Sequence, residues 1–203
     1  MNIKEEKSKI RKEICKRRAA IPSNVLSDIE KSLPGFIGAI EDKEFNKVLG
    51  KAKRIALYRA FKGEVPVDGL AQYFMDKGIR CCFPRIENDS MIFCDCGSLS
   101  DDEFEISPIG IKEPSASKPE VEPEDIDIVV LPAVAYNEEG TRLGMGGGFY
   151  DRYFGGADSA RPYLLGICYE FQICSEVPSE EQDITADFIA VIPEELYGNG
   201  NWS

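Results

Sequence analysis

Residues 126–133, Ile-Asp-Ile-Val-Val-Leu-Pro-Ala, decide the fold class of this chain. The run is almost entirely apolar, which is typical of a strand buried on both faces of a parallel sheet. Working outward from it, we predict further strands at residues 54–60, 79–84, 91–94, 163–169 and 188–192. Helices are predicted at residues 4–18, 23–33, 36–48, 68–77 and 149–154. This alternation predicts an α/β fold with a largely parallel central sheet.

Local signals set the expected ends of these elements. Pro34-Gly35 is expected to separate the second helix from the third, or to kink it. Asp68 is expected to cap the N-terminus of the fourth helix, and Gly78 to close its C-terminus. Residues 107–125 are rich in proline and polar side chains, so we expect a long surface connection there. Because this connection does not separate two parts of comparable core content, we expect one domain.

The bulk composition restricts the class of protein. Of the 203 residues, 43% are hydrophobic and 30% are charged, as in an ordinary globular domain. No apolar run approaches the roughly 20 residues needed to cross a bilayer, and no apolar signal core follows the N-terminal charges. The seven cysteines are an odd number scattered through the chain, which favours reduced thiols over a disulfide framework. We therefore expect a cytoplasmic protein with no membrane partner.

Charge is distributed unevenly along the chain. The net charge of -12 argues against nucleic acid as the main partner, because a phosphate backbone requires a basic surface. Residues 1–18 nevertheless hold eight Lys and Arg against three Glu, a net of +5, so the remaining residues must carry -17. A basic helix on an acidic body suggests electrostatic docking to that body or an anionic ligand held between the two.

A glycine-rich segment lies between the strand at 126–133 and the last predicted helix. It reads Arg142-Leu143-Gly144-Met145-Gly146-Gly147-Gly148-Phe149-Tyr150-Asp151-Arg152. Four glycines among five residues allow main-chain N–H groups to converge on an anion, whereas an ordinary strand-to-helix turn needs one or two glycines. The spacing matches neither the P-loop nor the dinucleotide-binding fingerprint. We therefore predict a phosphate-binding loop of a different kind.

Charged residues elsewhere are weaker candidates. Lys7 and Arg11 project from one face of the first predicted helix, although by pattern alone a solvated basic face is the simpler and favoured explanation. Asp151 and Asp183 are candidate Mg²⁺ ligands, and Asp183 by itself resembles any surface acid. Glu64 follows the end of a predicted strand, where α/β proteins place ligands.

Other kinds of chemistry have little support. The chain has no histidine, which removes the usual general base and the Ser-His and Cys-His nucleophile systems. Cys81-Cys82 and Cys94-Asp95-Cys96 are spaced poorly for structural zinc. Aromatic side chains suited either to stacking on a flat heterocycle or to core packing are Tyr58, Phe61, Phe149 and Tyr150.

Taken together, these residues resemble the 5-formyltetrahydrofolate cyclo-ligase family, also called methenyltetrahydrofolate synthetases. The glycine-rich segment is similar to the family's signature nearly residue for residue. The resemblance extends through the chain in order, at Lys7-x-x-x-Arg11, Tyr58 to Val65, Gly110-Ile111-Lys112-Glu113-Pro114 and Val129-Val130-Leu131-Pro132. It implies a single-domain, three-layer Rossmann-like α/β fold with a mostly parallel or mixed central sheet flanked by helices.

The resemblance also implies an activity. The family converts 5-formyltetrahydrofolate to 5,10-methenyltetrahydrofolate with ATP and Mg²⁺, releasing ADP and phosphate. The formyl oxygen takes the γ-phosphoryl group of ATP, N10 of the folate attacks the activated carbon, and phosphate leaves. Such phosphoryl transfer needs positioning and charge rather than a histidine. We expect 5-formyltetrahydrofolate as the small-molecule substrate, ATP and Mg²⁺ as cofactors, and a monomer.

The resemblance assigns roles to residues by their place in the motif. Arg142 and Lys7 would be the catalytic cations. ATP would be bound by Lys7, Arg11, Arg142, Leu143, Gly144, Met145, Gly146, Gly147, Gly148, Phe149 and Tyr150. The folate would be bordered by Arg59, Glu64, Met145, Gly146, Gly147, Gly148 and Phe149, and Mg²⁺ by Asp151 and Asp183. The chain departs from the family at Arg59, where an apolar residue is common, and at Gln182, where histidine is common.

Two other functions fit the same residues. The chain could bind a nucleotide or pterin without turning it over, although the intact Lys7, Arg11, Arg142 and Asp151 argue against this. It could also be an ATP-dependent ligase acting on another N-formyl or carboxyl compound, since a glycine loop recognises phosphate and not the acceptor.

Overall fold

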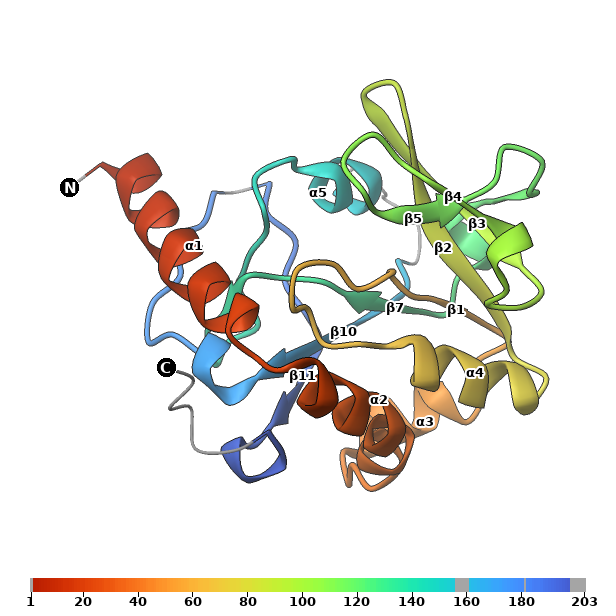
Figure 1. Cartoon of the computed structure of the whole chain (residues 1–203), viewed down its shortest axis with the longest axis horizontal. Helices are drawn as coiled ribbons and strands as arrows, with labels where there is room; N and C mark the ends of the chain where they lie inside the picture. Colours follow the sequence, from red (N-terminus) through yellow and green to blue (C-terminus); the bar gives the residue numbers. More distant parts are fainter. Residues whose placement is uncertain (1, 156–160, 181, 198–203) are drawn as a thin grey trace.

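A seven-stranded sheet forms the centre of the protein, in a computed structural model that describes residues 2–155, 161–180 and 182–197 (Figure 1). Its strand order is β11-β10-β7-β1-β2-β3-β6. The five strands from β11 to β2 run parallel, and β3 and β6 are antiparallel to their neighbours. The strands are β1 (Arg54–Ala56), β2 (Arg80–Glu87), β3 (Ser90–Cys96), β6 (Glu120–Val121), β7 (Ile128–Leu131), β10 (Tyr163–Tyr169) and β11 (Phe188–Ile192). The predicted, largely parallel α/β sheet is therefore confirmed.

The strand that decided the fold class lies beside the reversal of the strand order. From β1 the chain proceeds through α4 (Asp68–Asp76) to β2 on one side, and from β7 it proceeds to β10 and β11 on the other. All four residues of β7 are buried. Ligand sites of open α/β sheets lie outside the carboxyl ends of the strands at such a reversal. A ligand site is therefore expected at the carboxyl ends of β1 and β7.

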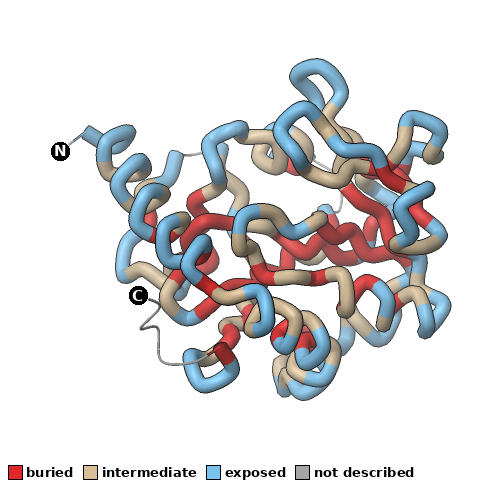
Figure 2. The backbone as a smooth tube through the Cα atoms, in the orientation of Figure 1, coloured by how far each residue is buried: buried red, intermediate tan, exposed pale blue. Residues whose placement is uncertain are grey.

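Helices cover the sheet unequally on its two faces. The helices α2 (Ser23–Gly38), α3 (Lys43–Leu49) and α4 pack on the face formed by alternate strand residues such as Ile55, Val130 and Ile167. The opposite face, with Ala56 and Val129, packs against α5 (Phe149–Phe154). Figure 2 shows the buried residues concentrated in the central strands between these two layers. This is the expected three-layer, single-domain arrangement.

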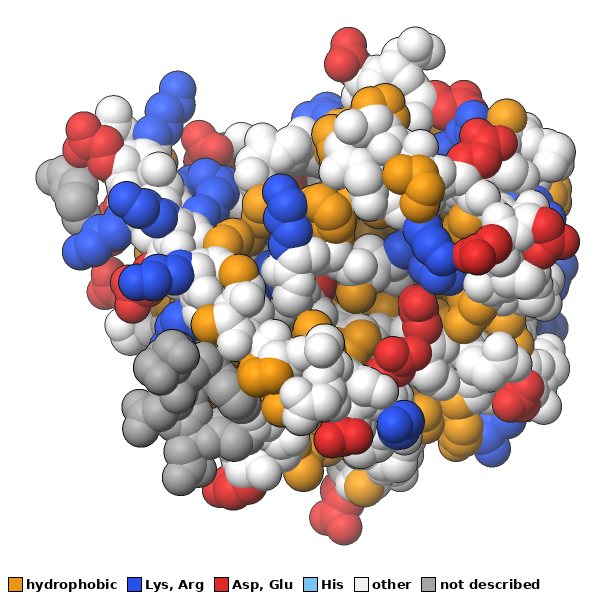
Figure 3. All heavy atoms as spheres, in the orientation of Figure 1, with side chains coloured by type: hydrophobic (Ala, Val, Ile, Leu, Met, Phe, Trp, Pro, Cys, Tyr) orange, Lys and Arg blue, Asp and Glu red, His pale blue; other side chains and the backbone are white. Residues whose placement is uncertain are grey.

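Helix α1 (Ile3–Ala19) stands at one end of the molecule, beside the small antiparallel pair β8 (Ala135–Tyr136) and β9 (Arg142–Leu143). Its Lys and Arg side chains gather on the left of Figure 3. The predicted basic helix is confirmed, and Asn2 caps it by accepting from Lys4 N at 3.0 Å. Among the described residues, no helix is both long and apolar enough to cross a membrane.

The predicted break at Pro34 is wrong. Helix α2 continues through Pro34 to Gly38, and a separate α3 begins at Lys43. Proline lacks an N–H, so the carbonyl of Glu30 loses its intrahelical donor. At that carbonyl α4 approaches so closely that a Cβ on Gly69 would lie 2.4 Å from Glu30 O. We infer that packing of α2 against α4 stabilises the helical conformation at Pro34, which the local sequence disfavours.

This contact predicts an effect on stability. Gly69→Ala should lower the free energy of unfolding by about 1–3 kcal/mol, because the added methyl collides with a backbone oxygen that cannot move freely. Gly35→Ala is the matched control, since a Cβ there meets nothing within 4 Å and alanine favours the helix. Urea unfolding of both variants tests the contact, and equal stabilities would contradict it.

Two further local predictions need correction. Asp68 does not cap α4: Val67 occupies the N-cap position, and the Asp68 carboxylate instead pairs with Arg59 at 3.2 Å. Residues 107–125 are not a plain surface connection, because they contain β5 (Lys112–Pro114), which pairs with β4 (Phe104–Ile106), and also β6, at the edge of the central sheet. In both cases long-range pairing overrides the composition of the segment.

Candidate functional site

A pocket of about 830 Å³ opens at the carboxyl ends of β1 and β7. Its walls come from α1, the turn after β1, strands β2 and β3, the β4–β5 hairpin and the glycine-rich loop. Every residue for which a site role was predicted lines it: Lys7, Arg11, Arg59, Glu64, Arg142, Leu143, Gly144, Met145, Gly146, Gly147, Gly148, Phe149, Tyr150, Asp151 and Asp183. Lys7 and Asp183, which are 176 positions apart in the sequence, thus share one cavity.

The glycine-rich loop connects β9 to α5 and forms one wall. Gly146 and Gly148 have φ values of 104° and 62°, which side-chain-bearing residues rarely adopt. A Cβ on Gly147 would lie 2.8 Å from the ring of Phe149. These three positions therefore favour glycine. The main chain of residues 145–147 is exposed and borders the cavity directly, because Met145 carries the only side chain in that segment.

Helix α1 places two cations against this loop. Arg11 Nε donates to Gly144 O at 2.9 Å. Lys7 Nζ lies 3.4 Å from carboxylate oxygens of Asp183 and Glu180. A solvated basic face, the simpler interpretation of the pattern, is therefore wrong for these two side chains. Of the two suggestions made by the charge asymmetry, docking of the helix on acidic residues is confirmed at Lys7. The anionic ligand stays a prediction, and the helix borders the cavity in which such a ligand would lie.

Arg142 is the most buried cation of the pocket, at 6% exposure. Its Nη2 lies 2.6 Å from Asp151 Oδ1, which also accepts from Ile184 N at 3.1 Å. Its Nε is buried without a hydrogen-bond partner in the part of the chain that the structure describes. A buried guanidinium with an unused donor is a group that a ligand oxygen would satisfy.

The donor set fits Mg²⁺ carried by a nucleotide better than a metal held by protein alone. Among the described residues, no group of three or more His, Cys, Asp or Glu side chains is placed to hold a metal. Asp151 and Asp183 both line the cavity, and Ile184, next to Asp183, donates to Asp151. Mg²⁺ at nucleotide sites takes one or two carboxylates and completes its shell with phosphate oxygens and water. Two carboxylates that line the same cavity as the glycine-rich loop are compatible with that requirement.

The opposite end of the pocket is formed by the turn after β1. Lys62 and Gly63 have φ values of 47° and 75°, which turn Glu64 back toward the strand end, where its Oε2 accepts from Phe61 N at 3.0 Å. Burial raises the pKa of the Glu64 carboxyl, and Arg18 and the Phe61 N–H partly lower it again. Arg18 Nη2 lies 3.3 Å from Glu64 Oε1. The pKa of this pocket carboxyl group therefore depends on a balance between its burial and its contacts with Arg18 and Phe61.

Arg59 occupies the same end. Its guanidinium lies over the Phe104 ring at 4.4 Å, and its Nη2 pairs with Asp68. Several wall residues were given no site role from the sequence, because they come from β2, β3 and the β4–β5 hairpin, whose approach to the site is a tertiary feature. They are mostly apolar: Pro84, Ile86, Met91, Ile109 and Ile111. Arg18 was likewise missed, since nothing distinguishes it from the other basic residues of α1.

The aromatic and sulfur-containing residues divide between site and core. Phe149 and Tyr150 line the pocket, whereas Tyr58 also donates from its hydroxyl to Val65 O at 2.9 Å within the core. All seven cysteines are free. Burial raises the pKa of the Cys81 thiol to about 12 and that of Cys94 to about 11, so neither is a ready nucleophile.

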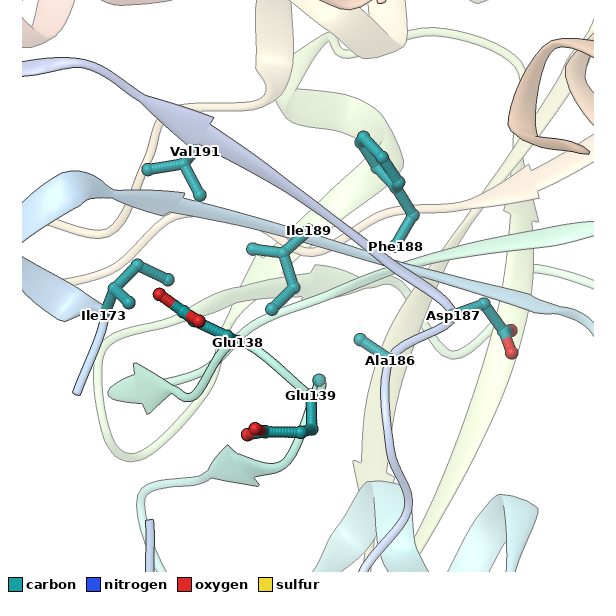
Figure 4. A pocket seen from close by; sticks show the side chains of 9 residues that line it. Glu138, Glu139, Ile173, Ala186, Asp187, Phe188, Ile189 and Val191 are labelled. Atoms are coloured by element: carbon teal, nitrogen blue, oxygen red, sulfur yellow. The ribbon is translucent and has the colours of Figure 1, made fainter. Parts of the chain in front are cut away.

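A second, smaller depression of about 400 Å³ lies beside Gly140 and β11 (Figure 4). Its lining includes the carboxylates of Glu138, Glu139 and Asp187, and no Lys or Arg among the residues described there. Such a lining repels a triphosphate. The larger pocket is the candidate site.

Comparison with known proteins agrees with this geometry. Residues 3–192 match the model of the 5-formyltetrahydrofolate cyclo-ligase family. A 5-formyltetrahydrofolate cyclo-ligase of Haemophilus influenzae is 30% identical over 185 residues, covering 89% of this chain and 94% of that one. The solved 5,10-methenyltetrahydrofolate synthetase of Mycoplasma pneumoniae is similar with a TM-score of 0.68 at 27% identity, covering 91% and 97% of the two chains. That of Aquifex aeolicus gives 0.71 at 28% identity, covering 91% and 89%. The family model matches nearly the whole chain, and the sheet, the glycine-rich loop and the pocket are consistent with it. The chain therefore belongs to the 5-formyltetrahydrofolate cyclo-ligase family.

Proposed function

We propose that this enzyme converts 5-formyltetrahydrofolate to 5,10-methenyltetrahydrofolate with consumption of ATP and release of ADP and phosphate. The observation that carries the proposal is the composition of one continuous cavity. One end has a glycine ribbon with Lys7, Arg11 and Arg142 around it, and the other has apolar walls and the Glu64 carboxylate. A triphosphate suits the first end, and a reduced pterin with N–H donors suits the second.

The residues of the chain supply positioning and charge for this reaction. The main chain of the glycine loop and the cations of α1 would hold the phosphates. Arg142 would stabilise the charge that develops as the γ-phosphoryl group passes to the formyl oxygen, because it is buried and fixed by Asp151. Attack of N10 on the activated carbon then closes the ring, N10 loses its proton, and phosphate leaves.

Binding of the folate would use the other end of the cavity. Glu64 would accept hydrogen bonds from N–H groups of the pterin, and Met145 to Phe149 would border the ring system between pterin and phosphate. Arg59 would contribute a flat cation held against Phe104. When bound, Mg²⁺ would neutralise phosphate charge, with Asp151 and Asp183 as its protein ligands. We also propose that the enzyme acts as a monomer in the cytoplasm, with its thiols reduced.

The test is product formation followed by the near-ultraviolet absorbance of the conjugated amidinium in the methenyl product. We expect product only when enzyme, ATP, Mg²⁺ and 5-formyltetrahydrofolate are all present. Ligand binding without product would instead support a binding protein that does not turn over. Faster turnover of other formylated amines or of carboxylates would support a ligase with a different acceptor.

Asp151→Asn should raise the Mg²⁺ concentration needed for half-maximal activity by about tenfold. The substitution keeps the shape of the side chain but removes the negative charge beside the phosphates. Activity titrated with Mg²⁺ at fixed ATP measures the effect. Asp101→Asn, which changes a carboxylate of an exposed ion pair with Lys112, provides the control. An unchanged Mg²⁺ dependence would exclude Asp151 as a ligand.

A further inference from the structure

Arg18 is a buried cation that stands behind the pocket rather than in it. It lies in the last turn of α1 with 2% of its surface exposed, whereas most cations of this helix face solvent. It does not line the cavity, yet within the described part of the chain every polar contact of its side chain is with the turn that presents Glu64. A buried arginine is costly unless its position serves a purpose.

The contacts of Arg18 converge on the turn at residues 61–64. Its Nη2 donates to Phe61 O at 3.1 Å and to Lys62 O at 3.3 Å, and lies 3.3 Å from Glu64 Oε1. The main chain is equally close, because a Cβ on Gly63 would lie 2.3 Å from Arg18 O. The end of α1 and this turn therefore fit together without space for adjustment, and the direction of Glu64 depends on Arg18.

We propose that Arg18 is a positioning residue for the folate: it holds the Glu64 carboxylate in place at the wall of the cavity, so that Glu64 accepts hydrogen bonds from the pterin. This inference rests on the proposed function and deepens it, because it places control of substrate binding in a residue that touches no substrate. It also connects the two ends of the cavity, since the same helix carries Lys7 and Arg11.

The electrostatic surroundings of Glu64 make Arg18 decisive. Among the residues described, the ionisable groups near enough to interact electrostatically with Glu64 are Arg18 from α1 and the hydroxyls of Tyr58 after β1, Tyr136 on β8, Tyr150 on α5 and Tyr169 on β10. Burial raises the pKa of all four tyrosines, so they stay neutral. Burial also raises the pKa of Glu64, and the first cause that opposes it is the charge of Arg18. Without that charge the carboxyl would hold its proton to a higher pH.

The unsatisfied atoms of Arg18 argue against a purely structural role. Its Nε and Nη1 are buried with no hydrogen-bond partner among the residues described. An ion pair selected only to hold two elements together would satisfy these donors, or an apolar pair would replace it at no cost. The interaction of Arg18 with the Glu64 carboxylate explains better why an arginine with two unsatisfied donors is buried here.

The experiment compares Arg18→Met, Arg18→Lys and the neighbouring control Arg17→Met. Arg17 lies on the same helix with its guanidinium over Phe171 at 4.3 Å, away from the turn. We expect Arg18→Met to raise KM for 5-formyltetrahydrofolate by roughly tenfold or more, with KM for ATP changed far less. The acidic limb of the kcat/KM profile should move to higher pH, because a group with a raised pKa binds its proton at a higher pH. Arg17→Met should match the wild type in both respects.

Two further variants separate positioning from folding. Arg18→Lys retains the charge but not the converging donors, so it should restore the pH profile while recovering KM in part. On a Glu64→Gln background, Arg18→Met should cause little additional loss, because the carboxylate through which Arg18 acts is absent. If Arg18→Met does not fold, Arg18→Lys still decides the matter, alone and combined with Glu64→Gln.

Equal losses of affinity for ATP and folate, an unmoved pH profile, or full additivity with Glu64→Gln would overturn the inference. Failure of the proposed function has a different signature, since the wild type would then form no methenyl product. In that case direct titration with 5-formyltetrahydrofolate, in wild type and Arg18→Met, still tests the positioning role.

Discussion

Arg142→Ala is expected to reduce kcat by about two to three orders of magnitude, the loss typical of removing one preorganised donor from developing charge. The guanidinium belongs to a nearly buried residue of the cavity wall, is fixed by Asp151 at 2.6 Å and has an Nε without a hydrogen-bond partner within the described residues. A charge held so rigidly needs no reorganisation when the phosphoryl group moves. The measurement is the steady-state rate of product formation at saturating ATP and folate, with circular dichroism to verify the fold.

An arginine–aspartate pair outside the pocket supplies the control for Arg142. Arg161 pairs with Asp187 through two contacts of 2.7 and 2.6 Å, and its side chain is largely exposed. Arg161→Ala should leave kcat unchanged. Near-normal turnover of Arg142→Ala would show that this residue does not stabilise the transition state. Its role would then be limited to its ion pair with Asp151.

Gly147→Val should eliminate measurable ATP binding, which corresponds to a rise in Kd of at least about 100-fold, while the protein remains folded. The first added atom would lie 2.8 Å from the Phe149 ring, so either that ring or the loop between Gly146 and Gly148 must shift, and both border the cavity. The fold should survive because residues 145–147 are exposed and contribute little to the core. Isothermal titration with ATP and Mg²⁺ measures the loss.

Gly97→Val is the matched control for this variant, since a Cβ there meets nothing within 4 Å. It should bind ATP as the wild type does. If Gly147→Val retained wild-type affinity, the nucleotide would not rest on this loop, and the assignment of the phosphate end of the pocket would have to be withdrawn.

The elements that were predicted well are those with strong local patterns. The apolar run at 126–133 contains the buried strand β7, and the basic segment at 4–18 forms α1 within a residue at each end. The break expected at Pro34 failed for the opposite reason: packing of α4 at the freed Glu30 carbonyl outweighs a local preference of one residue. Strand β5 was missed because its pairing with β4 and its hydrogen bonds with Arg85 and Ile86 of β2, rather than its own composition, hold it in place.

The site shows the same division. Glycine spacing alone predicted a loop of unusual backbone conformation, because only glycine readily adopts the φ values found at Gly146 and Gly148; that this loop binds phosphate stays a prediction. Pattern alone left Lys7 and Arg11 indistinguishable from solvated cations, and it contained no sign that Arg18 contacts Glu64, 46 positions away.

The chain by itself determined the α/β class, the glycine loop and the family signature, because backbone freedom and burial leave periodic and compositional traces within a few residues. Only the tertiary structure decided which cations meet that loop, which apolar walls complete the cavity and which arginine contacts Glu64. Those contacts join α1, the turn after β1, the β4–β5 hairpin and the segment around Asp183. These elements meet because the strand order of the sheet reverses between β1 and β7. Strand order is a property of the whole chain, so no local sequence pattern predicts it.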